Sequence, residues 1–227
     1  MGAATIELTA SDGHALDAYE SRPETPVAAI VIVQEIFGVN PHIRSVVDGY
    51  AVMGFHAIAP ALFDRVERGV ELGYAQDDVQ RGREIRLGIE WDVTMLDVGA
   101  AVGHVASDGP VAVIGYCWGG SVAWLAASAL PVAAAVGYYG GQITQFLDRP
   151  PKCPVLLHFG ALDSAIPLDG VAEIGEQYPD VELHVYADAD HGFNCDARAT
   201  YHPESAGLAL QRTLSFLSRN GVGAADL

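Results

Sequence analysis

Cys117 stands in the segment GYCWG, between an apolar run and an alanine-rich segment. Its spacing, G-x-C-x-G, is that of the nucleophile elbow G-x-S-x-G with cysteine in place of serine. In an elbow the nucleophile lies on a sharp strand-to-helix turn, where the N-terminus of the helix favours a thiolate. The pattern therefore predicts a reactive thiol, whereas a lone cysteine without these glycines is usually a small buried apolar residue.

Two residues later in the chain could activate this thiol. Asp163 lies in the segment GALDSAIP and His191 in DHGF. A histidine beside a thiol can take its proton, and a carboxylate on the far ring nitrogen fixes the tautomer. The chain order of nucleophile, acid and histidine is that of the α/β-hydrolases. Asp188 and Asp190 are alternative acids, although Asp190 adjoins the histidine and has difficulty reaching its ring.

The segment QEIFG directly follows the apolar run 27–33. In an elbow enzyme the oxyanion is bound by the N–H after the nucleophile and by an N–H from the loop after an early strand. These positions are Trp118 and Ile36. Glu35 adjoins the second position, and a carboxylate there has no role in an ordinary serine hydrolase.

The elements that position these residues are predicted from periodicity. Continuous β-branched runs indicate strands buried on both faces, and capping residues mark helices, as in Asn40-Pro41. Strands alternating with helices imply crossover connections and a mostly parallel sheet, and Asp12-Gly13 implies an N-terminal antiparallel hairpin. The predicted strands are 27–33, 55–60, 111–115, 132–139, 154–160 and 181–186, and the predicted helices are 41–54, 77–106 with a break near Gly88, one from Gly119, 168–178 and 205–218.

These elements predict a three-layer α/β domain with helices on both faces of the sheet, spanning 1–227 as a single domain. Ligands of open α/β sheets bind outside the carboxyl ends of the strands. Glu35, Cys117, Asp163 and His191 each follow a predicted strand. We therefore expect all four side chains to meet in one crevice.

Five segments in this order, QEIFGVN, GYCWGG, AVGYYG, GALDSAIP and HGF, resemble the dienelactone hydrolase (carboxymethylenebutenolidase) family, α/β-hydrolases with a cysteine nucleophile. The resemblance runs from the DGH at 12–14 to the last predicted helix. It implies that Cys117, Asp163 and His191 form a catalytic triad. It also implies that Glu35 holds the resting thiol and releases it when substrate displaces the carboxylate.

The resemblance also implies a substrate, since the family's type enzyme opens a lactone whose carboxylate is held by two arginines. One of them matches Arg81, with Arg83 and Arg86 as alternatives in register. The second should lie four residues after the histidine, where this chain has Cys195; Arg198 is the candidate replacement. This departure leaves the substrate open between a lactone and the ester or thioester of a general carboxylesterase or thioesterase.

Composition excludes several other functions. The net charge of −17 opposes binding to nucleic acid and to anionic membranes. The chain has no apolar run of about 18 residues and no secretory signal at its start, and its odd number of cysteines forms no disulfide framework, so we expect a cytoplasmic protein. It is expected to act as a monomer or small homo-oligomer on a small ester or lactone.

No cofactor or metal is expected at the predicted site. No G-x-G-x-x-G follows an early strand, so dinucleotide binding is not predicted. His191 and Cys195 are four residues apart, and Cys153 and His184 are also present, but there is no C-x-x-C or H-E-x-x-H pair. A redox-sensing thiol protein would share a reactive Cys117 but would have no use for Asp163 or for the oxyanion loop.

Overall fold

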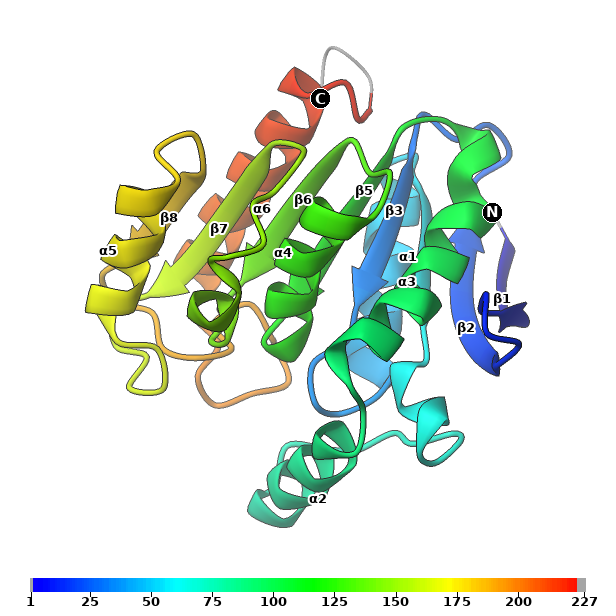
Figure 1. Ribbon diagram of the computed structural model, residues 1–227, viewed down its shortest axis with the longest axis horizontal. Coiled ribbons are helices and arrows are strands. Elements are labelled where there is room, and N and C mark those ends of the chain that lie inside the picture. The colour runs from blue at the N-terminus through cyan, green and yellow to red at the C-terminus, as the bar shows by residue number, and fades with distance from the viewer. Residues whose placement is uncertain (1, 224–227) are drawn as a thin grey trace.

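A single eight-stranded sheet runs through the computed structural model, which describes residues 2–223 (Figure 1). The spatial order is β1-β2-β4-β3-β5-β6-β7-β8. The β1–β2 hairpin is antiparallel, β2 pairs antiparallel with β4, and all remaining neighbours are parallel. The strands are β1 (Gly2–Thr9), β2 (Ala15–Arg22), β3 (Ala29–Val33), β4 (His56–Pro60), β5 (Val111–Tyr116), β6 (Ala134–Tyr138), β7 (Val155–Gly160) and β8 (Glu182–Tyr186).

Helices cover both faces of this sheet. In Figure 1, α3, α4 and α5 lie in front of the strands and α1 and α6 lie behind them, while α2 lies beyond the carboxyl ends of the strands. The predicted fold class, a three-layer α/β domain with an N-terminal antiparallel hairpin, is confirmed. The helices are α1 (Pro41–Val52), α2 (Gln76–Leu87), α3 (Trp91–Val105), α4 (Trp118–Ala129), α5 (Leu168–Gln177) and α6 (Pro203–Arg219), with short 3₁₀ helices η1 (Leu62–Arg65), η2 (Ala106–Asp108) and η3 (Ile143–Phe146).

Local sequence explains where several of these elements begin and end. The Asn40 side chain accepts a hydrogen bond from the N–H of Ile43 and caps α1, as its position before Pro41 predicted. The helical pattern at 77–106 divides into α2 and α3 at Gly88. β6 ends one residue earlier than predicted because Tyr139 has φ +41°, which leaves the β region.

The three central strands β3, β5 and β6 are buried along their whole length. Strands covered on both faces read as continuous apolar runs, which is why the sequence predicted them well. Within residues 2–223 no helix combines the length and the apolar composition needed to cross a bilayer.

Candidate active site

Cys117 lies on the sharp turn between β5 and α4, with φ 55° and ψ −115°. A non-glycine residue in this conformation is strained, and the surrounding packing must hold it there. The flanking glycines allow that packing. A Cβ at Gly119 would lie 2.3 Å from the carbonyl oxygen of Val33, so only glycine lets α4 approach β3 this closely. The turn has the geometry of a nucleophile elbow.

A continuous chain of hydrogen bonds links Cys117 to a buried carboxylate. The His191 Nε2 atom lies 3.1 Å from the Cys117 Sγ atom. The His191 Nδ1 atom lies 2.7 Å from Asp163 Oδ2, and the Asp163 side chain is only 1% exposed. The second oxygen of Asp163 accepts a hydrogen bond from the N–H of Ala165 at 2.9 Å, which fixes the carboxylate in place.

The alternative acids lie elsewhere. Asp190 accepts a hydrogen bond from the backbone N–H of His191 at 2.6 Å, so its carboxylate shapes the loop and does not contact the ring. Asp188 is exposed. The His191 carbonyl in turn accepts a hydrogen bond from the Thr200 hydroxyl at 2.8 Å. The loop after β8 thus holds the backbone of His191, while Asp163, in the loop after β7, orients its imidazole ring.

The surroundings favour the imidazolium form of His191. Burial by itself lowers the pKa of His191, but the negative charge of a Cys117 thiolate and the hydrogen bonds with Asp163 and Cys117 outweigh burial and raise this pKa to about 10. The arrangement therefore keeps a proton on the imidazole beside the Cys117 sulfur, where it can later be given to a leaving group.

This raised pKa predicts the alkaline limit of activity. Because the pKa is raised above its ordinary value, the protonated ring persists through neutral pH and is lost only as the pH rises through about 10. The imidazolium must donate a proton to the leaving group, so we expect kcat/KM for a neutral ester to fall over that window. Initial rates measured between about pH 7 and pH 11, with Cys117→Ala protein as the blank for spontaneous hydrolysis, check this. A decline complete by about pH 8 would contradict a stabilised imidazolium.

The two residues predicted to supply oxyanion donors line the same cavity as the thiol. Within the described part of the chain, the backbone N–H groups of Ile36 and Trp118 have no hydrogen-bond acceptor. Both residues line the cavity that contains Cys117 and His191. Two unpaired donors beside a nucleophile can bind the oxygen of a tetrahedral intermediate.

This cavity has a volume of about 540 Å³ and lies between α2 and the carboxyl ends of the strands. α2 contributes one face to its wall, with Val79, Arg83, Arg86 and Leu87 at positions i, i+4, i+7 and i+8. The helix approaches closely because Gly82 has no side chain: a Cβ there would lie 1.8 Å from the Ile36 carbonyl oxygen. A glycine inside a helical pattern can signal such a close approach.

Arg81 does not line this cavity, which corrects the expectation that it contacts substrate. Its side chain is 46% exposed, forms an ion pair with Glu67, and lies 3.8 Å from Glu84. The reason is the helical period, which turns Arg81 away from the face that carries Arg83 and Arg86. Of the three arginines that the sequence offered as substrate contacts, Arg83 and Arg86 line the cavity and Arg81 does not.

Arg86 is held at the cavity wall by aromatic rings. Its guanidinium lies 4.2 Å from the centroid of the Trp91 ring and 5.6 Å from that of Trp118. Burial lowers the pKa of Arg86 from its ordinary value, and the ring faces stabilise the cation. No periodicity or motif in the sequence pointed to Trp91 as part of the site.

Glu35 and Arg198 form an ion pair beside the thiol. Arg198 Nη1 donates to Glu35 Oε1 at 3.1 Å, and the Glu35 side chain is 1% exposed. The other oxygen, Glu35 Oε2, is buried without a hydrogen-bond partner in the described structure. Glu35 is therefore paired with Arg198 and Cys117 with His191, which differs from the expectation that Glu35 holds the thiol.

The route of Arg198 into the site depends on two small residues. A Cβ at Gly192, which has φ +77°, would lie 2.4 Å from Arg198 Nη1. Cys195 is buried, and burial together with the nearby charge of Glu35 raises the pKa of its thiol to about 11, so it stays neutral. A small neutral residue at position 195 leaves the space beside Glu35 to the Arg198 guanidinium.

Known proteins resemble this chain over nearly its whole length. The sequence model of the dienelactone hydrolase family matches residues 16–221. The carboxymethylenebutenolidase of Pseudomonas putida is 35% identical over 225 residues, which cover 94% of this chain and 95% of that protein. The carboxymethylenebutenolidase of Pseudomonas sp. (strain P51) is 33% identical over 226 residues, which cover 94% of each. A solved structure from Klebsiella pneumoniae subsp. pneumoniae MGH 78578, whose name places it with the dienelactone hydrolases, is 30% identical with a TM-score of 0.84, and the match covers 96% of this chain and 100% of that one.

Proposed function

This chain belongs to the dienelactone hydrolase family and is a hydrolase of small-molecule esters or lactones, and within that activity we propose that Cys117, His191 and Asp163 carry out the chemistry. The family match confirms the resemblance seen in the sequence. The single observation that carries the proposed roles is the hydrogen-bonded chain from Asp163 Oδ2 through His191 to Cys117 Sγ, with distances of 2.7 Å and 3.1 Å; His191 and Cys117 line the cavity.

The reaction proceeds by acyl transfer to sulfur. The Cys117 thiolate attacks the carbonyl carbon, and the N–H groups of Ile36 and Trp118 bind the oxyanion. His191 gives its proton to the leaving alkoxide as the carbon–oxygen bond breaks, which leaves an acyl thioester. His191 then takes a proton from water, the resulting hydroxide attacks the thioester, and the acid is released with the thiolate restored. Asp163 keeps the imidazole in the productive orientation throughout.

The substrate that the cavity suits best is a small ester or lactone bearing a carboxylate. Arg86 and Arg198 both line the cavity with Cys117, so an anionic group can be held by a guanidinium while the carbonyl faces the sulfur. Arg198 thus supplies the second carboxylate-binding arginine, which the family resemblance placed at position 195. A net charge of −17 makes such local cations necessary, because the field of the whole protein repels an anion.

We propose in addition that residues 1–227 form one domain, and that the protein acts in the cytoplasm as a monomer or small homo-oligomer without a nucleic-acid partner. The support is chemical. Cys117, Cys153 and Cys195 are all free thiols, which a reducing compartment preserves. The strongly acidic composition opposes contact with a polyanion.

The test is turnover by wild-type and Cys117→Ala protein of paired substrates, each a small carboxylated lactone or ester beside its uncharged methyl ester. We expect Cys117→Ala to remove turnover of both, because no other described thiol lies beside His191. Wild-type protein is expected to prefer the acid. Equal turnover by both proteins would overturn the role of Cys117, and a preference for the neutral esters would assign a general carboxylesterase on the same triad.

A further inference from the structure

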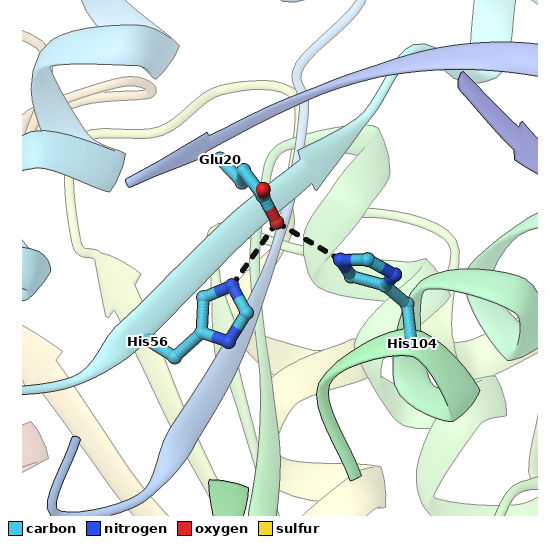
Figure 2. A group of neighbouring side chains, drawn as sticks. All are labelled: Glu20, His56 and His104. Atoms are coloured by element: carbon cyan, nitrogen blue, oxygen red, sulfur yellow. Dashed lines mark hydrogen bonds and ion pairs between the residues drawn. The ribbon is translucent and has the colours of Figure 1, made fainter. Parts of the chain in front are cut away.

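A second cluster of ionisable side chains lies at the end of the sheet opposite the active site, where the parallel strands β3 and β4 begin. Glu20 comes from β2, His56 from the first position of β4, and His104 from the last turn of α3 (Figure 2). Glu20 Oε2 lies 3.1 Å from His56 Nε2 and 2.9 Å from His104 Nε2. His56 pairs in register with Ala29, the first residue of β3, whereas the catalytic residues follow the last residues of their strands. The cluster therefore has no part in ester hydrolysis.

The orientation of His56 is set by a second carboxylate. His56 Nδ1 lies 2.6 Å from Asp108 Oδ2, and Asp108 is held in turn by two bonds of 2.8 Å from Arg22. Both oxygens of Asp108 accept from the Arg22 guanidinium, and Oδ2 also faces His56 Nδ1, so the two nitrogens of the His56 ring face different carboxylates: Nδ1 faces Asp108, and Nε2 faces Glu20. A histidine whose Nδ1–H is bound by a carboxylate while Nε2 points at other ligands is the usual outer arrangement of a metal site.

The three facing atoms are spaced as metal ligands are. All three lie within 4.8 Å of one another. Ligands about 2.0–2.1 Å from a tetrahedral ion lie about 3.3 Å apart, so small side-chain movements suffice to admit an ion. The His56 side chain is 4% exposed and that of His104 is 37% exposed, which closes the site on one side and leaves a position for water on the other.

We propose that Glu20, His56 and His104 bind a divalent transition-metal ion of the zinc class, with water as the fourth ligand. Two imidazoles and one carboxylate suit such an ion and are a poor set for magnesium or calcium, which prefer oxygen ligands. The ligands come from β2, β4 and α3, so the bound ion ties the N-terminal hairpin to the body of the sheet. Its role is structural, and it supplies no group to the hydrolytic reaction.

A second group of possible ligands, Glu35, His42 and Cys195, is not the proposed site. Glu35 is paired with Arg198, and His42 Nδ1 lies 3.1 Å from Asp196 Oδ1. These side chains belong to the surroundings of the active site. They must nevertheless be controlled for in any titration, as must the Cys117 thiol.

The experiment is a titration of the full chain, freed of metal by a chelator, with zinc chloride. Binding to the folded state raises Tm, and an ion at about a hundred times its dissociation constant gives a rise of about 5–10 °C for a chain of this length. We expect this rise, with one ion bound per chain by calorimetry, in wild-type protein and its loss in His104→Gln and Glu20→Gln. His104 is exposed, so its replacement leaves the fold intact, and the metal-free Tm of each variant provides the reference.

His184→Gln is the matched control, because His184 lies 2.9 Å from Glu182 as a histidine–carboxylate pair without a third ligand among residues 2–223. It should keep the full zinc-dependent rise, and so should Cys117→Ala and Cys195→Ser. Ester turnover by wild-type protein should be equal with and without one equivalent of zinc. The proposal is overturned if wild-type Tm does not rise, if His104→Gln responds as wild type does, or if the rise disappears in Cys117→Ala or Cys195→Ser.

Discussion

Asp163→Asn is expected to lower kcat for ester hydrolysis by about 10³- to 10⁴-fold while leaving the fold unchanged. The carboxylate accepts the hydrogen of His191 Nδ1 at 2.7 Å, and it is buried, so no water can replace it. An amide can offer its NH₂ group to the same nitrogen, which stabilises the wrong tautomer. Single-turnover and steady-state kinetics with an activated ester measure the loss, and circular dichroism checks the fold.

The pH profile separates loss of the orienting charge from a general disturbance of the loop. The Asp163 hydrogen bond and charge contribute to the raised pKa of His191, so their removal should move the alkaline decline of kcat/KM from about pH 10 to lower pH. Asp190→Asn is the matched control, since Asp190 contacts the backbone N–H and not the ring of His191. If Asp190→Asn caused the larger loss, the acid of the triad would be wrongly assigned.

Arg198→Ala is expected to lower the free energy of unfolding by about 3 kcal/mol, because it leaves the Glu35 charge buried and unpaired. Glu35 is 1% exposed, and its Oε2 atom already has no hydrogen-bond partner in the described residues. Removing the charge as well should recover most of the loss, so Glu35→Gln/Arg198→Ala is predicted to be clearly more stable than Arg198→Ala alone. Urea denaturation of the three proteins gives the values.

Arg44→Ala is the control for this prediction. Arg44 forms a two-bond ion pair with Glu71 at 2.6 Å and 2.5 Å, but both side chains are about one-third or more exposed. A surface pair of this kind contributes about 0–1 kcal/mol. Equal effects of Arg44→Ala and Arg198→Ala would contradict a buried pair at Glu35.

The Arg198→Ala variant also tests the proposed substrate class. If Arg198 binds the substrate carboxylate, Arg198→Ala should reduce kcat/KM for acids by about tenfold or more and change neutral esters little. An equal loss for both kinds of substrate would mean that Arg198 acts only through Glu35.

Much of the site could be predicted because short-range patterns determine it. The glycines around Cys117 are required by the close approach of α4 to β3, and this requirement is visible in the sequence as G-x-C-x-G. Asp163 and His191 follow β7 and β8, and parallel strands bring such residues to one edge of the sheet. Buried central strands and the cap at Asn40 are equally local features.

What only the tertiary structure decided is which distant side chains meet. Whether Arg81, Arg83 or Arg86 faces the cavity depends on the rotation of α2, and that rotation is set by the contact of Gly82 with the Ile36 carbonyl. The pairing of Arg198 with Glu35 depends on the path of a loop through Gly192 at φ +77°.

The Glu20, His56 and His104 cluster has no spacing motif, because its members lie on three elements far apart in the chain. No metal site was expected because the sequence contains no C-x-x-C or H-E-x-x-H pair. Spacing in sequence reports neighbours only within one strand or helix. Contacts between elements depend on how the sheet and its helices pack, and that is a property of the whole fold.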